Sequence, residues 1–194
     1  FELGNYNLML DTSAENLYGT PVLTVKDGGK LILAGGGTGQ FNVKGWSTAV
    51  ISILGANSEA TVHNVELIGN GDGVYMYGSS DLLDGGAITV KGDIKAEDGN
   101  GITVNAKNAT VVVDGNITAG VIGVETWTNF GVLVTVNGNI TVIDDTPDDI
   151  YVYEVRGIRA YSGTTVKVNG NVIVERCNSE ESTCIGVHAY GGTI

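Results

Sequence analysis

The chain has 194 residues, a formal net charge of −12 and 30 glycines, but only 10 lysines and arginines. The negative charge would repel phosphate groups, so it argues against nucleic-acid binding and favours cationic or neutral partners. No stretch reaches the roughly 20 apolar residues that span a bilayer, so membrane insertion is not expected. Abundant glycine, valine, isoleucine, threonine and asparagine, with few strong helix formers, predict an all-β fold in a single domain, residues 1–194.

Residues 1–72 show a rhythm of strands and turns without a strict repeat. Two stretches carry it, VLTVKDGGKLILAGG from Val22 and AVISILGANSEATVHNVELIG from Ala49. In both, apolar residues alternate with others and are interrupted by glycine-containing turns, a pattern typical of short strands. His63 lies in the second stretch, and we expect it to face solvent at a turn. We also expect less regular coils here than in residues 73–194.

Residues 73–194 contain the repeat V-x-V-x-G-[N/D]-[I/V], incomplete in its first copy, with glycines at Gly92, Gly115, Gly138 and Gly170. Alternation of the Val-x-Val type places alternate side chains on one face of a short strand. The glycine and the residue after it suit a tight bend with one positive φ. The residues that follow the glycines would then stack in a turn ladder bonded from coil to coil, formed by Asp93, Asn116, Asn139 and Asn171.

A second motif, G-[I/V]-x-[V/A/T/M], alternates with the first and opens at Gly73, Gly101, Gly123, Gly157 and Gly186. From its glycine to the next first-motif glycine the chain advances 14 residues (101 to 115), 15 (123 to 138) and 13 (157 to 170). The return legs vary more: 9 residues (92 to 101), 8 (115 to 123), 19 (138 to 157) and 16 (170 to 186). One side of each turn is therefore a constant scaffold, and the other carries insertions.

Strands of this length are too short to form an ordinary sheet, but they can stack coil upon coil. At a spacing of about 4.8 Å every strand finds a parallel neighbour above and below, and the inward valines and isoleucines form one apolar column. The residues expected to stack in one sheet are Val22, Val50, Val74, Ile102, Val124, Ile158 and Val187. The sequence thus predicts a right-handed single-stranded parallel β-helix, a solenoid of about seven coils.

The two motifs, V-x-V-x-G-N-I alternating with G-I-x-A-Y, resemble those of pectate-lyase-like right-handed parallel β-helices, particularly the repetitive regions of bacterial surface and adhesin-like proteins. The likeness covers residues 73–194. It implies three parallel sheets, a stacked asparagine at the short turn and functional loops elsewhere. Because the same helix serves lyases, hydrolases, phage tail spikes, adhesins and surface-layer proteins, the resemblance implies an architecture and leaves the function open.

The second motif leads into an aromatic residue in most coils: Tyr77, Trp127, Tyr161 and Tyr190, with Asn105 in the equivalent place. If the valines and alanines point inward, these rings point outward. A column of exposed rings could stack on sugar faces, which makes the four aromatic residues candidates for binding a polysaccharide or glycan, or it could contact a partner chain. The alternative is that the rings stack on one another and only cover the end of the sheet.

Glu125, Arg159 and His188 lie two residues before these aromatic positions, on three successive coils of the same outward face. A carboxylate, a guanidinium and an imidazole in line could perform acid–base chemistry on a polysaccharide. The alternative is a surface salt bridge with a solvated histidine beside it.

Calcium is the only cofactor that the sequence suggests, because pectate-lyase-like catalysis implies calcium held by closely spaced carboxylates beside an arginine base. The clustered carboxylates here are Asp144, Asp145, Asp148 and Asp149, in the stretch DDTPDD. Pro147 excludes a core strand and indicates a solvated loop. The loop lacks the spacing of a recognised calcium loop, which counts against lyase activity.

Cys177 and Cys184 are the only cysteines and lie in a polar segment, CNSEESTC. We predict a local disulfide between them, with two free thiols as the alternative. A disulfide would fit an extracellular or cell-surface location.

Regularity without a complete catalytic constellation favours a non-catalytic extracellular module, adhesin-like, stalk-like or filament-forming, that touches glycans through its aromatic column. The rival interpretation is a polysaccharide lyase or glycoside hydrolase acting on the outer face of the β-helix. The last residues, GVHAYGGTI, stop where the preceding coil continues into V-x-V, so one coil is unfinished. Because exposed strand edges invite pairing, we expect either a longer natural chain or end-to-end self-association.

Overall fold

The computed structural model describes residues 2–17, 19–33, 37–77, 84–127, 131–144, 154–175 and 183–194. These residues form 20 β-strands in three parallel sheets, and no helix occurs among them. No membrane-spanning helix is therefore found in the described ranges.

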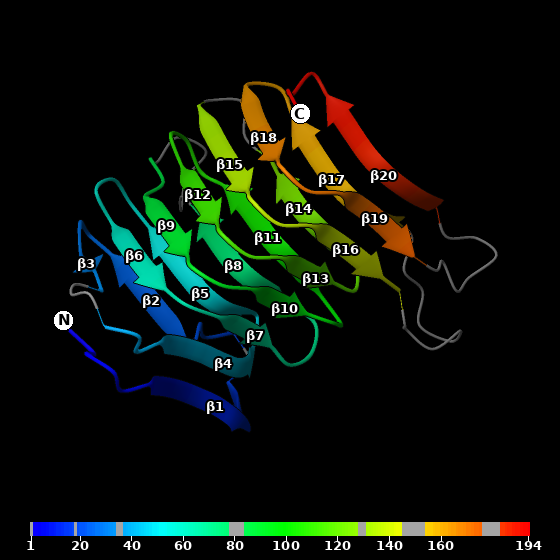
Figure 1. The fold of residues 1–194 in the computed structure, drawn as a ribbon. Coiled ribbons are helices and arrows are strands. Elements are labelled where there is room, and N and C mark those ends of the chain that lie inside the picture. The colour runs from blue at the N-terminus through cyan, green and yellow to red at the C-terminus, as the bar shows by residue number, and fades with distance from the viewer. Residues whose placement is uncertain are drawn as a thin grey trace.

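Each sheet is a stack of strands that are three apart in the chain (Figure 1). The first sheet consists of β1 (Leu8–Leu17), β4 (Phe41–Ser47), β7 (Val65–Leu67), β10 (Ile94–Ala96), β13 (Ile117–Ala119), β16 (Ile140–Ile143) and β19 (Val172–Glu175). The second sheet consists of β2 (Leu23–Lys26), β5 (Ala49–Leu54), β8 (Asp72–Tyr77), β11 (Asn100–Asn105), β14 (Ile122–Thr126), β17 (Glu154–Tyr161) and β20 (Thr183–Tyr190). The third sheet consists of β3 (Lys30–Leu31), β6 (Glu59–Val62), β9 (Ala87–Val90), β12 (Thr110–Val113), β15 (Val132–Val136) and β18 (Thr164–Val168).

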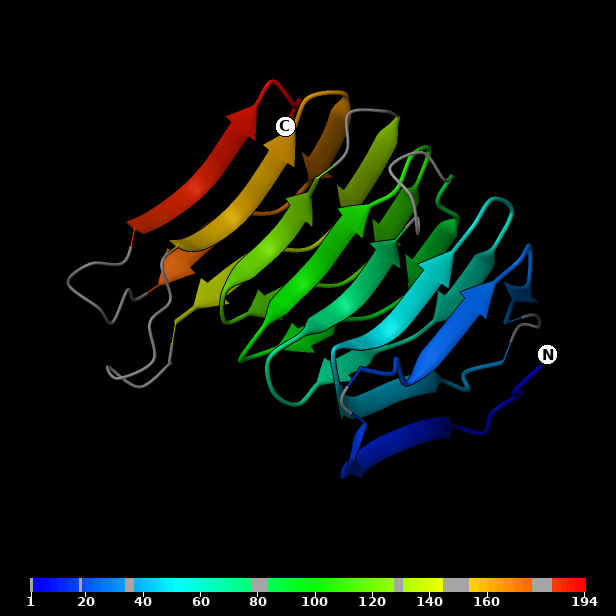
Figure 2. The same ribbon diagram turned by 180° about the vertical axis from the view of Figure 1, so that it is seen from behind.

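Three consecutive strands thus make one coil, and the predicted fold is confirmed: an all-β parallel β-helix of about seven coils with three strands per coil. Figure 2 shows the second sheet from its other side, running from β2 in blue to β20 in red. The two ends of the stack are formed by β1 and β20 (Figure 1).

A single apolar column fills the space between the three sheets. In β12 the side chains alternate, with Val111 and Val113 buried and Thr110 and Val112 half-buried. The same period of two recurs in β15, where Val132, Val134 and Val136 are buried. Each of these strands therefore turns its branched side chains toward the core. Because each coil covers the apolar side chains of the next, the core is continuous along the stack.

The register of the second sheet differs by one residue from the prediction at its N-terminal end. Leu23 pairs with Ile51, and Ile51 pairs with Val74, whereas Val22 and Val50 were expected at these positions. Val50 instead occupies the position that a glycine holds in the following coils. Val50 and Ile51 are both fully buried, so the unbroken apolar run of β5 allowed two registers to be read from the sequence.

The first-motif glycines are required by close packing, and the positive φ expected of these turns is wrong. None of Gly92, Gly115, Gly138 and Gly170 has a φ in the left-handed region, and neither do the residues that follow them. A Cβ atom on Gly115 would lie 2.5 Å from the carbonyl oxygen of Gly92. On Gly170 it would lie equally close to the carbonyl oxygen of Gly138. The turns therefore stack so tightly that a carbonyl of one coil fills the space of a side chain on the next.

The turn ladder is present, with bonds to the backbone of the next coil. The backbone N–H of Asn116 donates to Oδ1 of Asp93 at 2.7 Å, and the N–H of Asn139 donates to Oδ1 of Asn116 at 2.9 Å. Asn171 donates in the same way to Asn139 at 2.8 Å. Asn64, which the motif did not include, extends the ladder by accepting from Asp93 at 2.9 Å. These side chains therefore stabilise the stacking of coils.

Candidate functional site on the outer face of the second sheet

Two rows of side chains run along the outer face of the second sheet. We call the first the polar row; its members pair in register along the sheet and are Ser52, Tyr75, Thr103, Glu125, Arg159 and His188. We call the second the aromatic column; it contains Tyr77, Trp127, Tyr161 and Tyr190, with Asn105 beside Tyr77. Both rows point outward because they alternate with fully buried residues such as Val74 and Met76.

The aromatic column is a stack of nearly parallel rings. The centroids of Trp127 and Tyr161 are 5.5 Å apart with an interplanar angle of 15°, and those of Tyr161 and Tyr190 are 4.8 Å apart at 14°. Tyr161 thus has a ring on both faces, whereas Trp127 and Tyr190 remain 46% and 40% exposed. Mutual stacking, the alternative raised by the sequence, therefore occurs in this column, and the exposed surface of its outer members remains accessible.

Glu125 and Arg159 form a hydrogen-bonded ion pair beneath these rings. Nη1 of Arg159 lies 2.9 Å from Oε1 of Glu125, and Nη2 donates to the hydroxyl of Tyr161 at 2.8 Å. The guanidinium carbon lies 4.8 Å from the Trp127 ring centre, within cation–π range. Burial raises the pKa of Glu125, and hydrogen bonds from Trp127 and Arg159 partly offset this effect. The pair is therefore partly desolvated, unlike an ordinary surface salt bridge.

His188 takes the next place in the polar row but is not part of this ion pair. Its ring stacks on Tyr190, with centroids 3.9 Å apart, and its backbone pairs with Arg159. Its Nδ1 atom is buried and has no hydrogen-bond partner among the described residues. The three candidate acid–base residues thus lie on β14, β17 and β20, but only Glu125 and Arg159 are joined by a hydrogen bond in the described structure.

Arg156 is a charged residue of this face that the sequence analysis missed. Only 1% of its surface is exposed, and its Nη2 atom lies 2.6 Å from Oε1 of Glu154. Its Nε and Nη1 atoms are buried without a hydrogen-bond partner in the described part of the chain. The guanidinium also lies 5.9 Å from the Tyr190 ring centre. Two arginines and two glutamates therefore gather beside the aromatic column.

Asp72 lies on β8, in the N-terminal half of the same sheet, where a cavity of about 380 Å³ lies over β5 and β8. Oδ1 of Asp72 accepts hydrogen bonds from the Thr103 hydroxyl and, at 3.2 Å, from the Asn100 amide. Burial raises the pKa of Asp72 to about 6, the two hydrogen bonds oppose this shift, and the Glu125 charge adds to it. The cavity is lined by Pro21, Thr48, Ser52, Leu54, Tyr75 and Tyr77, among others.

One sequence signal could have identified Asp72 and Arg156. Both stand directly before a second-motif glycine, as does Asn100, and in the sheet Asp72 pairs with Asn100. The equivalent position in β14 is the apolar Ile122, which pairs with Arg156 in the sheet. A polar residue at this position therefore departs from the apolar pattern seen in β14. The polar residues before these glycines therefore belong to the outer-face site.

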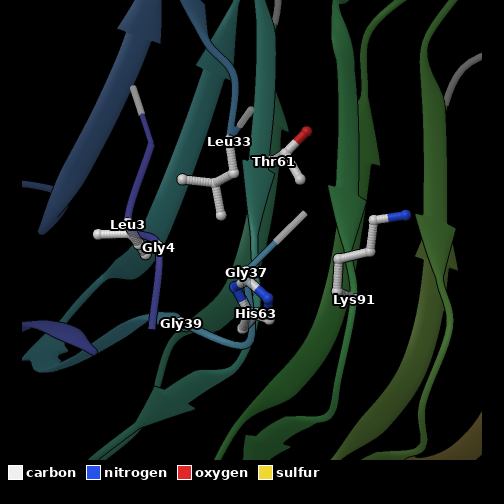
Figure 3. A pocket seen from close by; sticks show the side chains of 8 residues that line it. All are labelled: Leu3, Gly4, Leu33, Gly37, Gly39, Thr61, His63 and Lys91. Carbon is white, nitrogen blue, oxygen red and sulfur yellow. The ribbon is translucent and has the colours of Figure 1, made fainter. Parts of the chain in front are cut away.

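A second cavity, of about 210 Å³, lies between the N-terminal segment at Leu3 and Gly4 and the end of β6 at Thr61 and His63 (Figure 3). His63 lies at a bend after β6, as expected, but it lines this cavity and is half-buried. Its Nδ1 atom accepts a hydrogen bond from the Phe41 N–H at 3.0 Å. Burial and the charge of Lys91 lower the pKa of His63. The Lys91 ammonium points away from His63 (Figure 3) and lies 3.5 Å from Asp114.

The predicted calcium loop and disulfide fall largely outside the described residues. Asp145, Asp148 and Asp149 lie outside them, and Asp144 is buried at the end of β16, not solvated. The described part of the chain holds no group of three or more metal-ligating side chains. Cys177 also lies outside it, so both the calcium site and the pairing with Cys184 stay predictions.

Compared with protein-family models, curated proteins and solved structures, the chain gives no significant match. Its function is therefore inferred from the geometry of the outer face of the second sheet.

Proposed function

We propose that the chain is a non-catalytic, extracellular surface module, adhesin-like or stalk-like, that holds an extended glycan on the outer face of its second sheet. The observation that carries this proposal is the stack of Trp127, Tyr161 and Tyr190 in the aromatic column, beside the polar row. Sugar rings offer apolar C–H faces and hydroxyl groups, and aromatic side chains with adjacent hydrogen-bonding groups complement both. The likeness of the repeat to surface and adhesin-like β-helices favours the same interpretation.

The rigidity of the scaffold supports binding of a polymer over binding of a single sugar. Stacked coils repeat the outward side chains at about 4.8 Å, so a linear chain can contact several coils at once. The Glu125–Arg159 pair fixes the ring of Tyr161 through a hydrogen bond at 2.8 Å. Because the rings are ordered before binding, little side-chain entropy is lost when a ligand docks.

The test is binding of a panel of neutral and acidic polysaccharides to the chain and to Trp127→Ala. Trp46→Ala is the matched control, because Trp46 is 41% exposed but lies on the first sheet. We expect Trp127→Ala to weaken binding about tenfold, the loss of a stacking contact worth about 1.4 kcal/mol, and Trp46→Ala to have no effect. Equal losses in both variants, or none in Trp127→Ala, would contradict glycan binding at this face.

The alternative, a polysaccharide lyase or glycoside hydrolase, is favoured by a single observation, the raised pKa of the Glu125 carboxyl group next to Arg159. A general acid needs such a shift to hold its proton near neutral pH. The same polysaccharides, incubated with and without calcium and analysed for cleavage, distinguish the two functions. Cleavage that is abolished by Arg159→Ala would replace the binding module by the enzyme.

A further inference from the structure

The cavity over β5 and β8 contains an acidic group without a cationic partner. Within the described ranges Asp72 forms no ion pair, and its hydrogen-bond donors, Thr103 and Asn100, are neutral. The charged group that acts on it electrostatically is Glu125, which is also acidic. A carboxylate removed from water without a compensating cation is costly, so the site favours the arrival of a positive charge.

The walls of the same cavity suit an organic cation. Tyr75 and Tyr77 line it and stack on each other, with centroids 5.7 Å apart and an interplanar angle of 9°. Each ring keeps one face outside this pair, and aromatic faces attract ammonium groups. Pro21 and Leu54 add apolar surface, and Ser52 adds a hydroxyl. The net charge of −12 raises the concentration of cations near the protein.

We propose that this cavity binds a protonated amino group, carried by an amino sugar of the glycan that lies on the outer face. The carboxylate of Asp72 pairs with the ammonium group, and Tyr75 and Tyr77 contact the sugar ring. The cavity volume of about 380 Å³ lies within the range of about 300–1,000 Å³ typical of small-molecule sites. The sugar as carrier rests on the proposed function, because the cavity continues the aromatic column through Tyr77; the ammonium site itself does not.

Two oligosaccharides with the same backbone test the proposal by calorimetry at pH 6.5. A glucosamine trimer carries amino groups, and an N-acetylglucosamine trimer carries neutral amides. We expect the glucosamine trimer to bind at least about tenfold more tightly, and Asp72→Asn to abolish this preference. Asn retains an oxygen that accepts the bonds of Thr103 and Asn100, so the fold is preserved. Glu97→Gln, which changes an exposed carboxylate on another part of the surface, is the control and should keep the preference.

Choline serves as a probe whose positive charge does not depend on pH. Its affinity should fall as the pH is lowered through about 6, where Asp72 becomes protonated, and Asp72→Asn should remove this dependence. The neutral isostere 3,3-dimethylbutanol should bind at least about tenfold more weakly than choline.

Two results would overturn the proposal. Equal affinity for the two trimers would exclude recognition of the amino group, and binding of choline without binding of the glucosamine trimer would exclude a sugar as its carrier. Neutral glycans that still lose affinity in Trp127→Ala would show that the outer face binds glycans all the same. Failure of the ammonium site and failure of the proposed function are therefore distinguishable.

Discussion

At the scale of single residues, Asp72 makes the stability of the protein depend on pH. Burial raises the pKa of its carboxyl group from 3.8 to about 6, so the folded state binds a proton more tightly than the unfolded state. The stabilisation from this proton is fully present below about pH 4 and is lost as the pH rises through about 6. At pH 7 the ionised carboxylate therefore lowers the free energy of unfolding by about 1–3 kcal/mol, allowing for partial exposure.

Asp72→Asn should remove this destabilisation, because the amide carries no charge at any pH. We expect its free energy of unfolding to exceed that of the unmodified chain by about 1–3 kcal/mol at pH 7 and to equal it near pH 4. Urea denaturation at the two pH values measures both differences. A constant difference at both pH values would mean that the carboxyl group titrates in the folded protein as it does in the unfolded chain.

Residue spacing predicted the polar row but not all of its neighbours. Glu125, Arg159 and His188 follow from the period of two, because each stands one residue after an inward-pointing valine or isoleucine of the second sheet. Asp72 and Arg156 do not, since each stands two residues before a buried valine or isoleucine, where the period of two predicts an inward side chain. A polar residue directly before a second-motif glycine is the sequence signal that singles them out, and the hydrogen bond from Thr103 to Asp72 shows in the structure that this position reaches the outer face.

At the scale of single elements, the second-motif glycines are sites where the second sheet approaches the first. A Cβ atom on Gly123 would lie 2.6 Å from the carbonyl oxygen of Gly157 and would also collide with Ile140 of β16. Gly186 occupies the same position in β20, yet a Cβ atom there would meet nothing within 4 Å. Replacing each glycine by alanine therefore compares a crowded position with an open one at the same place in the repeat.

We expect Gly123→Ala to lower the free energy of unfolding by about 1–3 kcal/mol, because backbone and side chains must shift to admit the methyl group. Gly186→Ala should change it by no more than about 0.5 kcal/mol. Chemical denaturation followed by circular dichroism provides both values. If both variants lost the same stability, a local effect of alanine on the strand backbone would be responsible and close packing would not.

The repeat predicted which elements form but gave the wrong cause for the four first-motif glycines. Val-x-Val and the following Gly-Asn correctly placed the strands of the third sheet and the turn ladder of Asn116 and Asn139. A sequence shows that glycine recurs, but positive φ and close approach produce the same recurrence. Only the contacts between Gly92 and Gly115 distinguish the two causes.

At the scale of the whole molecule, the number of coils could be predicted because one repeat unit determines each coil, and the three-sheet arrangement was implied by the resemblance to known β-helices. The prediction was weakest where the repeat is least regular. In β5 the unbroken apolar run permitted a register shifted by one residue, and Val50 took the place of a glycine. The cavity over β5 and β8 lies in this less regular region, where the repeat could not be used to predict which residues lie side by side.

The last strand of the stack leads to a prediction about assembly. Val187 lies in register with the buried Ile158, yet it is 47% exposed because β20 has a neighbour on one side only. The segment after β20 already starts pairing with the third sheet, through a bridge between Thr193 and Thr165. Unpaired backbone groups beside an exposed apolar side chain favour the addition of another strand.

We therefore expect the 194-residue chain to associate end to end as its concentration rises. Val187→Lys should suppress this association, since a charge at an inward position cannot be covered by the apolar side chains of a second copy. Lys95→Ala, on the outward side of β10, should leave it unchanged. Light scattering after size exclusion measures the mass of each variant. A monomer at every concentration would show that the edge of β20 does not recruit another chain.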